Sequence, residues 1–233
     1  MRSAIAITAM LAASGAVMAD SVDLAYTGPG TGRSFTVLTD GTSTSVFAGQ
    51  LTFNVANGSG AGAQLNGPLM TYCIDVLEGV GAGLNTYDLA DLKDAPVTAG
   101  GDPAMGAEKA KAIGRLYTAA GGDQFGTSND FAAAFQLAVW EVIADFGSDS
   151  GLSVDSGDFQ VTSSITAGTQ SVLNGLLAAA ADDSVFSFTG LGALTNEGFQ
   201  DQLYSVAVPL PGAMGLAAVG LAGVGFATRR RRF

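Results

Sequence analysis

Two side chains, a thiol and a carboxamide, carry the chemistry that this sequence offers. Cys73, within Thr71–Val76 (TYCIDV), is the only cysteine among 233 residues, and the chain contains no histidine. A cysteine hydrolase needs a base that forms the reactive thiolate, and histidine is the usual base. The sequence therefore argues against a cysteine hydrolase, and we predict no catalytic residue and no enzyme activity.

The carboxamide belongs to Gln136, in the segment Phe135–Val142 (FQLAVWEV). Gln136 and Trp140 are four residues apart, so they share one face of a predicted helix, and that face is otherwise apolar. A buried carboxamide costs free energy unless it is hydrogen-bonded or chemically used. Gln136 is therefore either a hydrogen-bonded core residue or the partner of a reactive group, and its spacing alone leaves both interpretations open.

Taken together, the two segments resemble the motifs of bacterial thioester domains, in which a cysteine and a glutamine of a surface adhesin join in an internal thioester. Tyr-Cys-Ile-Asp at residues 72–75 is similar to the strand motif, and Gln-x-Ala-Val-Trp at residues 136–140 is similar to the helix motif. The resemblance extends over residues 22–208 and implies a cross-link between Cys73 and Gln136. Phe135 stands where the family often has threonine.

The chemistry implied by this resemblance requires positioning rather than a cofactor or a metal. The thiolate attacks the amide carbon of glutamine and ammonia leaves, provided that the fold holds the two groups in near-attack geometry. The thioester then acylates an amine or a hydroxyl on a target molecule and frees the cysteine. Tyr72 and Trp140 are the candidates that shield the thioester from water. Asp75 or Glu141 is the candidate that orients the incoming nucleophile.

The elements that must hold these groups change character along the chain. The first part alternates polar and apolar residues, as in Gln50–Val55, with hairpin-type turns at Asp40-Gly41 and Asn57-Gly58. Further strands are predicted at residues 70–76, 84–92, 185–188 and 203–208. Helices are predicted at residues 104–120, 131–146 and 169–181. Candidate N-caps of the second are Ser128, Asn129 and Asp130. The predicted fold class is α+β, a β-sandwich or β-sheet with an inserted helical subdomain.

Both ends of the chain carry predicted targeting segments around a domain at residues 20–207. Residues 1–19 have an early arginine, an apolar run and small residues at the expected cleavage site after Ala19. These three features predict a signal peptide. Residues 208–233 resemble PEP-CTERM sorting signals of the VPLPA type, although Gly212 departs from that motif. The short motif consists of Val208, Pro209, Leu210 and Pro211. The motif is followed by an uncharged run, which predicts a transmembrane helix, and then by four arginines.

The resemblance of this terminus implies a Gram-negative cell and an exosortase-type processing enzyme as a partner. It also implies transient anchoring in the inner membrane, followed by release to the cell surface or to a biofilm or other extracellular matrix.

The charge of the predicted domain limits its partners. All 21 acidic residues lie between Asp20 and Asp201, against five basic residues, which gives a net charge of −16. Such a surface repels nucleic acid. The acidic loop does not have EF-hand spacing, so no metal site is predicted; its acids are Asp145, Asp149, Asp155 and Asp158. Two hypotheses remain: covalent attachment through a thioester, or a non-catalytic structural matrix protein with a buried free Cys73.

Overall fold

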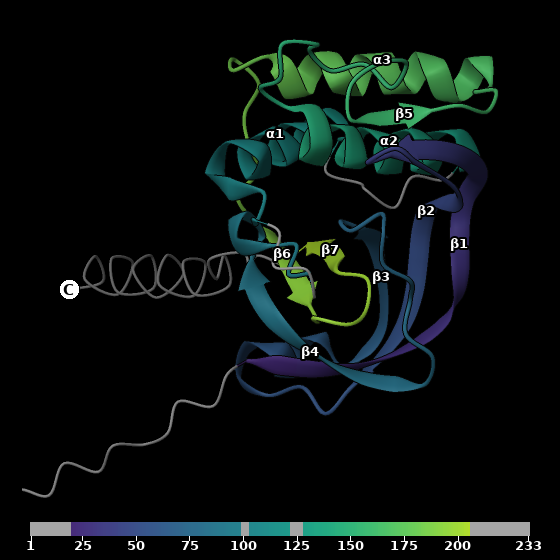
Figure 1. Cartoon of the computed structure of the whole chain (residues 1–233). Coiled ribbons are helices and arrows are strands. Elements are labelled where there is room, and N and C mark those ends of the chain that lie inside the picture. Colours follow the sequence, from purple (N-terminus) through teal and green to yellow (C-terminus); the bar gives the residue numbers. More distant parts are fainter. Residues whose placement is uncertain (1–19, 99–102, 122–127, 206–233) are drawn as a thin grey trace, which may run out of the picture.

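The computed structural model describes residues 20–98, 103–121 and 128–205 (Figure 1). The predicted signal peptide and the predicted sorting signal, with its transmembrane helix, lie outside these ranges. Within the described ranges, no helix is both long and apolar enough to cross a membrane. The fold is α+β, with a large antiparallel sheet and a few helices, as the sequence predicts.

The strands form one sheet that closes on itself. They are β1 (Ser21–Thr39), β2 (Thr42–Ala56), β3 (Gly67–Cys73), β4 (Leu84–Asp91), β5 (Phe159–Val161), β6 (Leu191–Thr195) and β7 (Gln202–Ser205). Their order is β2-β3-β7-β6-β4-β1-β5, and β2 also pairs with β1. All strands except β5 therefore make a closed barrel. A sandwich would need two facing sheets, so the sandwich alternative is wrong and the single sheet is correct.

The long β1–β2 hairpin connects the barrel to the helices. Its predicted two-residue turn at Asp40-Gly41 is confirmed, because both residues have positive φ, 48° and 72°. Two register irregularities interrupt β1 on either side of Pro29, and Gly28, at φ 138°, supplies a conformation that other residues rarely adopt. The first part of β1 therefore closes the barrel against β4, whereas its last part pairs with β5.

Three helices lie across one end of the barrel (Figure 1). They are α1 (Gly106–Ala119), α2 (Asn129–Asp145) and α3 (Ala167–Ala181). Of the three candidate N-caps of α2, Ser128 is the one used: its side chain accepts a hydrogen bond from the Phe131 N–H at 3.1 Å, and Asn129 and Asp130 already lie in the helix. Residues 132–142 of α2 are all buried, because this helix packs against β1 and β2 on one side and α3 on the other. A helix that is apolar all round is expected in such a central position.

Two short 3₁₀ helices, η1 (Gly60–Leu65) and η2 (Leu92–Asp94), complete the described elements. The first lies in the connection between β2 and β3, residues 57–66. The chain reverses there as the sequence predicts, since β2 and β3 pair antiparallel and Asn57 has a φ of 52°. The reversal takes this longer connection rather than a two-residue turn at Asn57-Gly58. The strand predicted at residues 185–188 is also wrong: this segment is irregular and packs on α1, where the Phe188 N–H donates to the Gly114 carbonyl at 3.1 Å. Strand β6 follows it instead.

Candidate functional site

The fold brings Cys73 and Gln136 into direct contact, although they are 63 residues apart in sequence. Cys73 is the last residue of β3 and Gln136 lies in the second turn of α2, and both are buried. The Cys73 N–H donates to Gln136 Oε1 at 2.8 Å. Gln136 Nε2 donates to the Cys73 carbonyl at 2.7 Å. The carboxamide thus pairs with both backbone groups of the cysteine.

Packing around these two residues fixes their relative position. Tyr72, the residue before Cys73, packs against Phe135, the residue before Gln136, with ring centroids 4.8 Å apart and the rings tilted by 54°. Tyr72 and Phe135 are both completely buried. On the other side of Cys73, the Ile74 N–H donates to the Asp201 carbonyl at 3.0 Å, next to β7. The end of β3 is therefore held by α2 on one side and by β7 on the other. The contact between Cys73 and Gln136 is part of the hydrophobic core.

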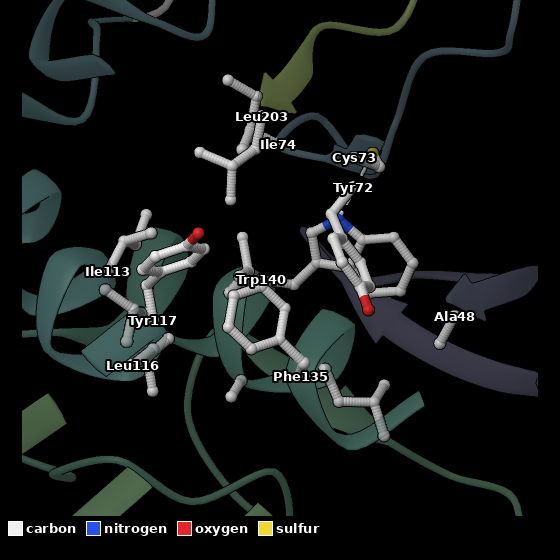
Figure 2. Close-up of a cluster of buried hydrophobic side chains, with 14 of the residues drawn as sticks. Ala48, Tyr72, Cys73, Ile74, Ile113, Leu116, Tyr117, Phe135, Trp140 and Leu203 are labelled. Atoms are coloured by element: carbon white, nitrogen blue, oxygen red, sulfur yellow. Dashed lines mark hydrogen bonds between the residues drawn. The ribbon is translucent and has the colours of Figure 1, made fainter. Parts of the chain in front are cut away.

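The sulfur of Cys73 has three hydrogen-bonding contacts. The thiol donates to the Asp75 carbonyl at 2.8 Å, and it accepts from the Asp75 N–H at 3.2 Å. The indole N–H of Trp140 donates to it at 3.4 Å. Figure 2 shows the indole of Trp140 near Cys73, with its nitrogen on the side of the ring toward the cysteine. The turn after β3 and one aromatic ring therefore surround the sulfur.

Burial determines the protonation state of this thiol. Removal of water raises the pKa of Cys73 well above its ordinary value of 9.0, and the hydrogen bonds from Trp140 and Asp75 oppose that shift only in part. A thiol with a raised pKa is protonated at neutral pH and reacts slowly with external electrophiles. The environment of Cys73 is therefore unlike that of an activated cysteine nucleophile.

A cleft of about 480 Å³ lies beside the site, although neither Cys73 nor Gln136 is among its lining residues. Its lining includes Trp140 and Asp75, the two residues that contact the sulfur. Asp40 and Asp158, both exposed, add negative charge, and Lys109 adds a cation that is engaged with the Ile143 carbonyl at 2.5 Å. A small nucleophile therefore has a route to the neighbourhood of Cys73, along a wall that carries three carboxylates.

The other predicted site residues differ in where they lie. Tyr72 is in the core and Trp140 touches the sulfur. The Asp75 carboxylate accepts the backbone N–H groups of the two residues that begin the next turn, Leu77 at 3.1 Å and Glu78 at 3.3 Å. It therefore fixes the turn around the sulfur, and it is the Asp75 backbone that contacts Cys73.

Glu141 lies apart from the sulfur contacts. Its Oε1 accepts the Ser153 N–H at 2.6 Å, in the loop after α2, and its Oε2 has no hydrogen-bond partner among the described residues. Glu141 is fully buried, and loss of water raises its pKa to about 7. Glu141 therefore contacts the loop after α2. Its contacts do not support the predicted role of orienting a nucleophile at Cys73.

Sequence reasoning missed two buried polar residues beside Cys73. Gln202 is completely buried and pairs with Cys73 across β3 and β7; its Oε1 accepts from the Thr71 hydroxyl at 2.7 Å. Directly opposed residues on antiparallel strands point to the same face, so Gln202 is a second carboxamide near the thiol. The carboxylate of Asp201 accepts the Val97 and Asn196 N–H groups at 2.6 and 2.7 Å, and burial raises its pKa to about 7. The sequence predicted only a strand, at residues 203–208, in this part of the chain, because the pairing register of strands is not visible in sequence.

The first carboxylate of the predicted acidic loop, Asp145, is the last residue of α2 and has a structural role. Asp145 is buried and accepts the N–H groups of Asp158 and Phe159 at 2.9 and 3.0 Å. Among the residues that the structure describes, no group of three or more potential ligand side chains is arranged to hold a metal ion. No protein-family model, curated protein or solved structure matches this chain.

Proposed function

We propose that this protein carries an internal thioester between Cys73 and Gln136 and uses it to attach covalently to an amine or a hydroxyl of a surface or matrix component. The observation that supports it most is the direct, buried contact between these two residues across 63 positions of sequence. The motif resemblance to bacterial thioester domains led to the same pair. The proposed activity is a single attachment event rather than turnover, so the protein is not proposed to be an enzyme.

The contacts of the carboxamide suit the condensation. The Cys73 N–H lies 2.8 Å from Gln136 Oε1, where negative charge develops when sulfur attacks the amide carbon. A hydrogen-bond donor already in place at such an oxygen stabilises the tetrahedral intermediate. Collapse of that intermediate expels the Nε2 amine as ammonia, and the proton of the thiol leaves with it. Holding the reacting groups in one core replaces a catalyst, because proximity supplies a large effective concentration.

Burial supports the stability of the product. Water must be kept from a thioester until the target arrives, and Cys73 is 2% exposed while Gln136 is completely buried. Trp140 stands between the sulfur and the cleft, since it contacts the first and lines the second. The proposed route for the nucleophile is therefore the cleft, and the proposed barrier to water is the indole ring together with the turn at Asp75.

Export and sorting complete the proposal. A signal peptide at residues 1–19 would deliver the chain across the inner membrane. The segment at residues 208–233 would anchor it transiently there until an exosortase-type enzyme acts near Val208-Pro209-Leu210-Pro211. The cell surface or the extracellular matrix of a Gram-negative bacterium is then the place of attachment, and adhesion or biofilm formation the process.

Intact-mass measurement of the secreted chain and three variants tests the thioester. The wild-type chain is expected to be lighter than its sequence by one ammonia, and Cys73→Ala and Gln136→Ala are expected to have full mass. Gln202→Ala is the matched control, since Gln202 is also buried beside Cys73; it is expected to keep the deficit. Full mass in the wild-type chain contradicts the proposal. If the deficit is lost in Gln202→Ala but kept in Gln136→Ala, the thioester forms with Gln202 and the assignment to Gln136 is wrong.

One observation favours a second candidate, a structural matrix protein with a free buried thiol. Both polar atoms of the Gln136 side chain have hydrogen-bond partners, so the intact carboxamide is already a satisfactory core group. In that case the wild-type chain has full mass. One thiol per chain then reacts with a labelling reagent after unfolding, whereas a chain with the thioester yields that thiol only after a nucleophile has opened the bond.

A further inference from the structure

The contacts of the Cys73 sulfur point to a role for Trp140 beyond shielding. We infer that the indole N–H of Trp140, together with the backbone N–H of Asp75, stabilises the Cys73 sulfur as it leaves during opening of the thioester. This inference rests on the proposed function, because it concerns the step in which the thioester reacts. Because its N–H contacts the reacting sulfur directly, Trp140 acts on the opening step itself and not only as a shield.

The two donors approach the sulfur from separate parts of the fold. The Asp75 N–H lies 3.2 Å from Sγ and belongs to the turn after β3. The Trp140 N–H lies 3.4 Å from Sγ and belongs to α2. Trp140 is itself buried, at 3% exposure, and its ring packs against Phe159, with centroids 5.9 Å apart. Both donors are therefore held in place before any reaction.

The hydrogen bonds from these two N–H groups to the sulfur become stronger as the thioester opens. The sulfur of a thioester has no hydrogen and is only a weak acceptor, whereas a thiolate is an anion. Hydrogen bonds to charged groups are roughly twice as strong as neutral ones. Cys73 is only 2% exposed, and removal from water makes a bare thiolate a poor leaving group in this site. Preorganised N–H groups at the departing atom therefore stabilise the transition state more than the ground state.

The step balances as follows. The nitrogen of an incoming amine forms a bond to the thioester carbonyl carbon of Gln136, and the resulting oxyanion accepts the Cys73 N–H. The carbon–sulfur bond then breaks, and the Cys73 sulfur keeps its electron pair as a thiolate, to which the Asp75 and Trp140 N–H groups donate hydrogen bonds. A proton from the attacking nitrogen finally moves to the sulfur. The products are a substituted amide on Gln136 and a thiol that can donate again to the Asp75 carbonyl.

An atomic replacement at Trp140 tests this inference. The chain has one tryptophan, so biosynthetic replacement by the benzothiophene analogue changes the indole N–H to sulfur at that position alone. Methylamine is the nucleophile, and intact mass follows the opening. Both proteins are expected to start lighter by one ammonia, and the analogue is expected to open at least about tenfold more slowly, as loss of a charged hydrogen bond predicts. Phe159→Leu, which loosens the ring but keeps the N–H, is expected to open no more slowly than the wild type.

The outcomes separate the two proposals. Equal opening rates for the indole and benzothiophene proteins, with the ammonia deficit present in both, overturn the role of Trp140 and leave the thioester intact. A wild-type chain of full mass overturns the thioester and this inference with it. Trp140→Phe serves in the same comparison if the analogue protein does not fold.

A spectroscopic readout that needs no thioester checks the contact itself. The Raman band of the indole ring that responds to N–H hydrogen bonding reports on Trp140 alone, since no other tryptophan is present. Cys73→Ala removes the acceptor and is expected to shift this band toward its position for a weakly bonded indole. Cys73→Ser keeps an acceptor and is expected to shift it less. An identical band in the wild type and in Cys73→Ala would overturn the N–H to sulfur contact.

Discussion

A cross-link between Cys73 and Gln136 predicts a large loss of thermal stability when a small nucleophile opens it. The bond would close a loop of 63 residues, and the chain-entropy relation for a loop of that length gives about 4 kcal/mol of stabilisation. Opening by methylamine leaves a methylamide whose N–H can again donate to the Cys73 carbonyl, which returns about 1 kcal/mol. The expected net loss is about 3 kcal/mol.

Thermal unfolding of the secreted chain before and after methylamine treatment measures this loss. For a domain of this size, about 3 kcal/mol corresponds to a decrease in Tm of about 6–12 °C. Intact mass must show that every chain carries one methylamine. Cys73→Ser provides the control, because it cannot form the bond and its Tm is expected to be the same with and without methylamine. A fully methylamine-labelled wild-type chain with unchanged Tm, or an equal decrease in the control, would refute the reasoning.

Three further predictions address the core, the buried acid and the terminus. Tyr72→Ala removes a completely buried ring that packs on Phe135 and is expected to cost about 3–5 kcal/mol in denaturant unfolding; a loss well below that range would contradict the packing described. Glu141 has a pKa raised from its ordinary 4.5 to about 7 by burial, so the folded state binds its proton more tightly and the free energy of unfolding falls as pH rises from about 4.5 to about 7. In Glu141→Gln this fall is expected to be smaller, as urea midpoints at about pH 5 and about pH 7.5 will show; an undiminished fall argues that the carboxyl is not buried. Deletion of residues 229–233 is expected to leave unprocessed or mislocalised protein in cell fractionation, and unchanged processing would count against the sorting signal.

The helices were predictable because their signals are local. Helix α2 has a serine N-cap and apolar residues on all sides, and both features predict a buried helix without knowledge of its partners. The strands were harder to predict from the sequence. Strand β6 contains Gly192 and Ala193, which are poor strand formers, yet it is completely buried between β4 and β7. The segment at 185–188 has good strand formers but packs on α1.

Closure of the barrel could not be predicted, since it depends on pairing between distant strands. The first five residues of β1 pair with β4, which lies 59 to 67 positions later, from Ala25 opposite Leu84 to Ser21 opposite Asp88. The same limit applies to the candidate site. A family resemblance, not periodicity, connected Cys73 with Gln136, and nothing in the sequence indicated that Gln202 lies opposite Cys73 or that the Asp75 backbone holds the sulfur. These contacts arise from strand register and turn geometry, which composition and spacing do not specify.

A crystal structure of the secreted wild-type chain at high resolution is the most direct test of the central claim. The account predicts continuous electron density from Sγ of Cys73 to the side-chain carbonyl carbon of Gln136, with no nitrogen left on that carbon. Separate density for a thiol and an intact carboxamide, arranged as the hydrogen-bonded pair described above, would contradict it.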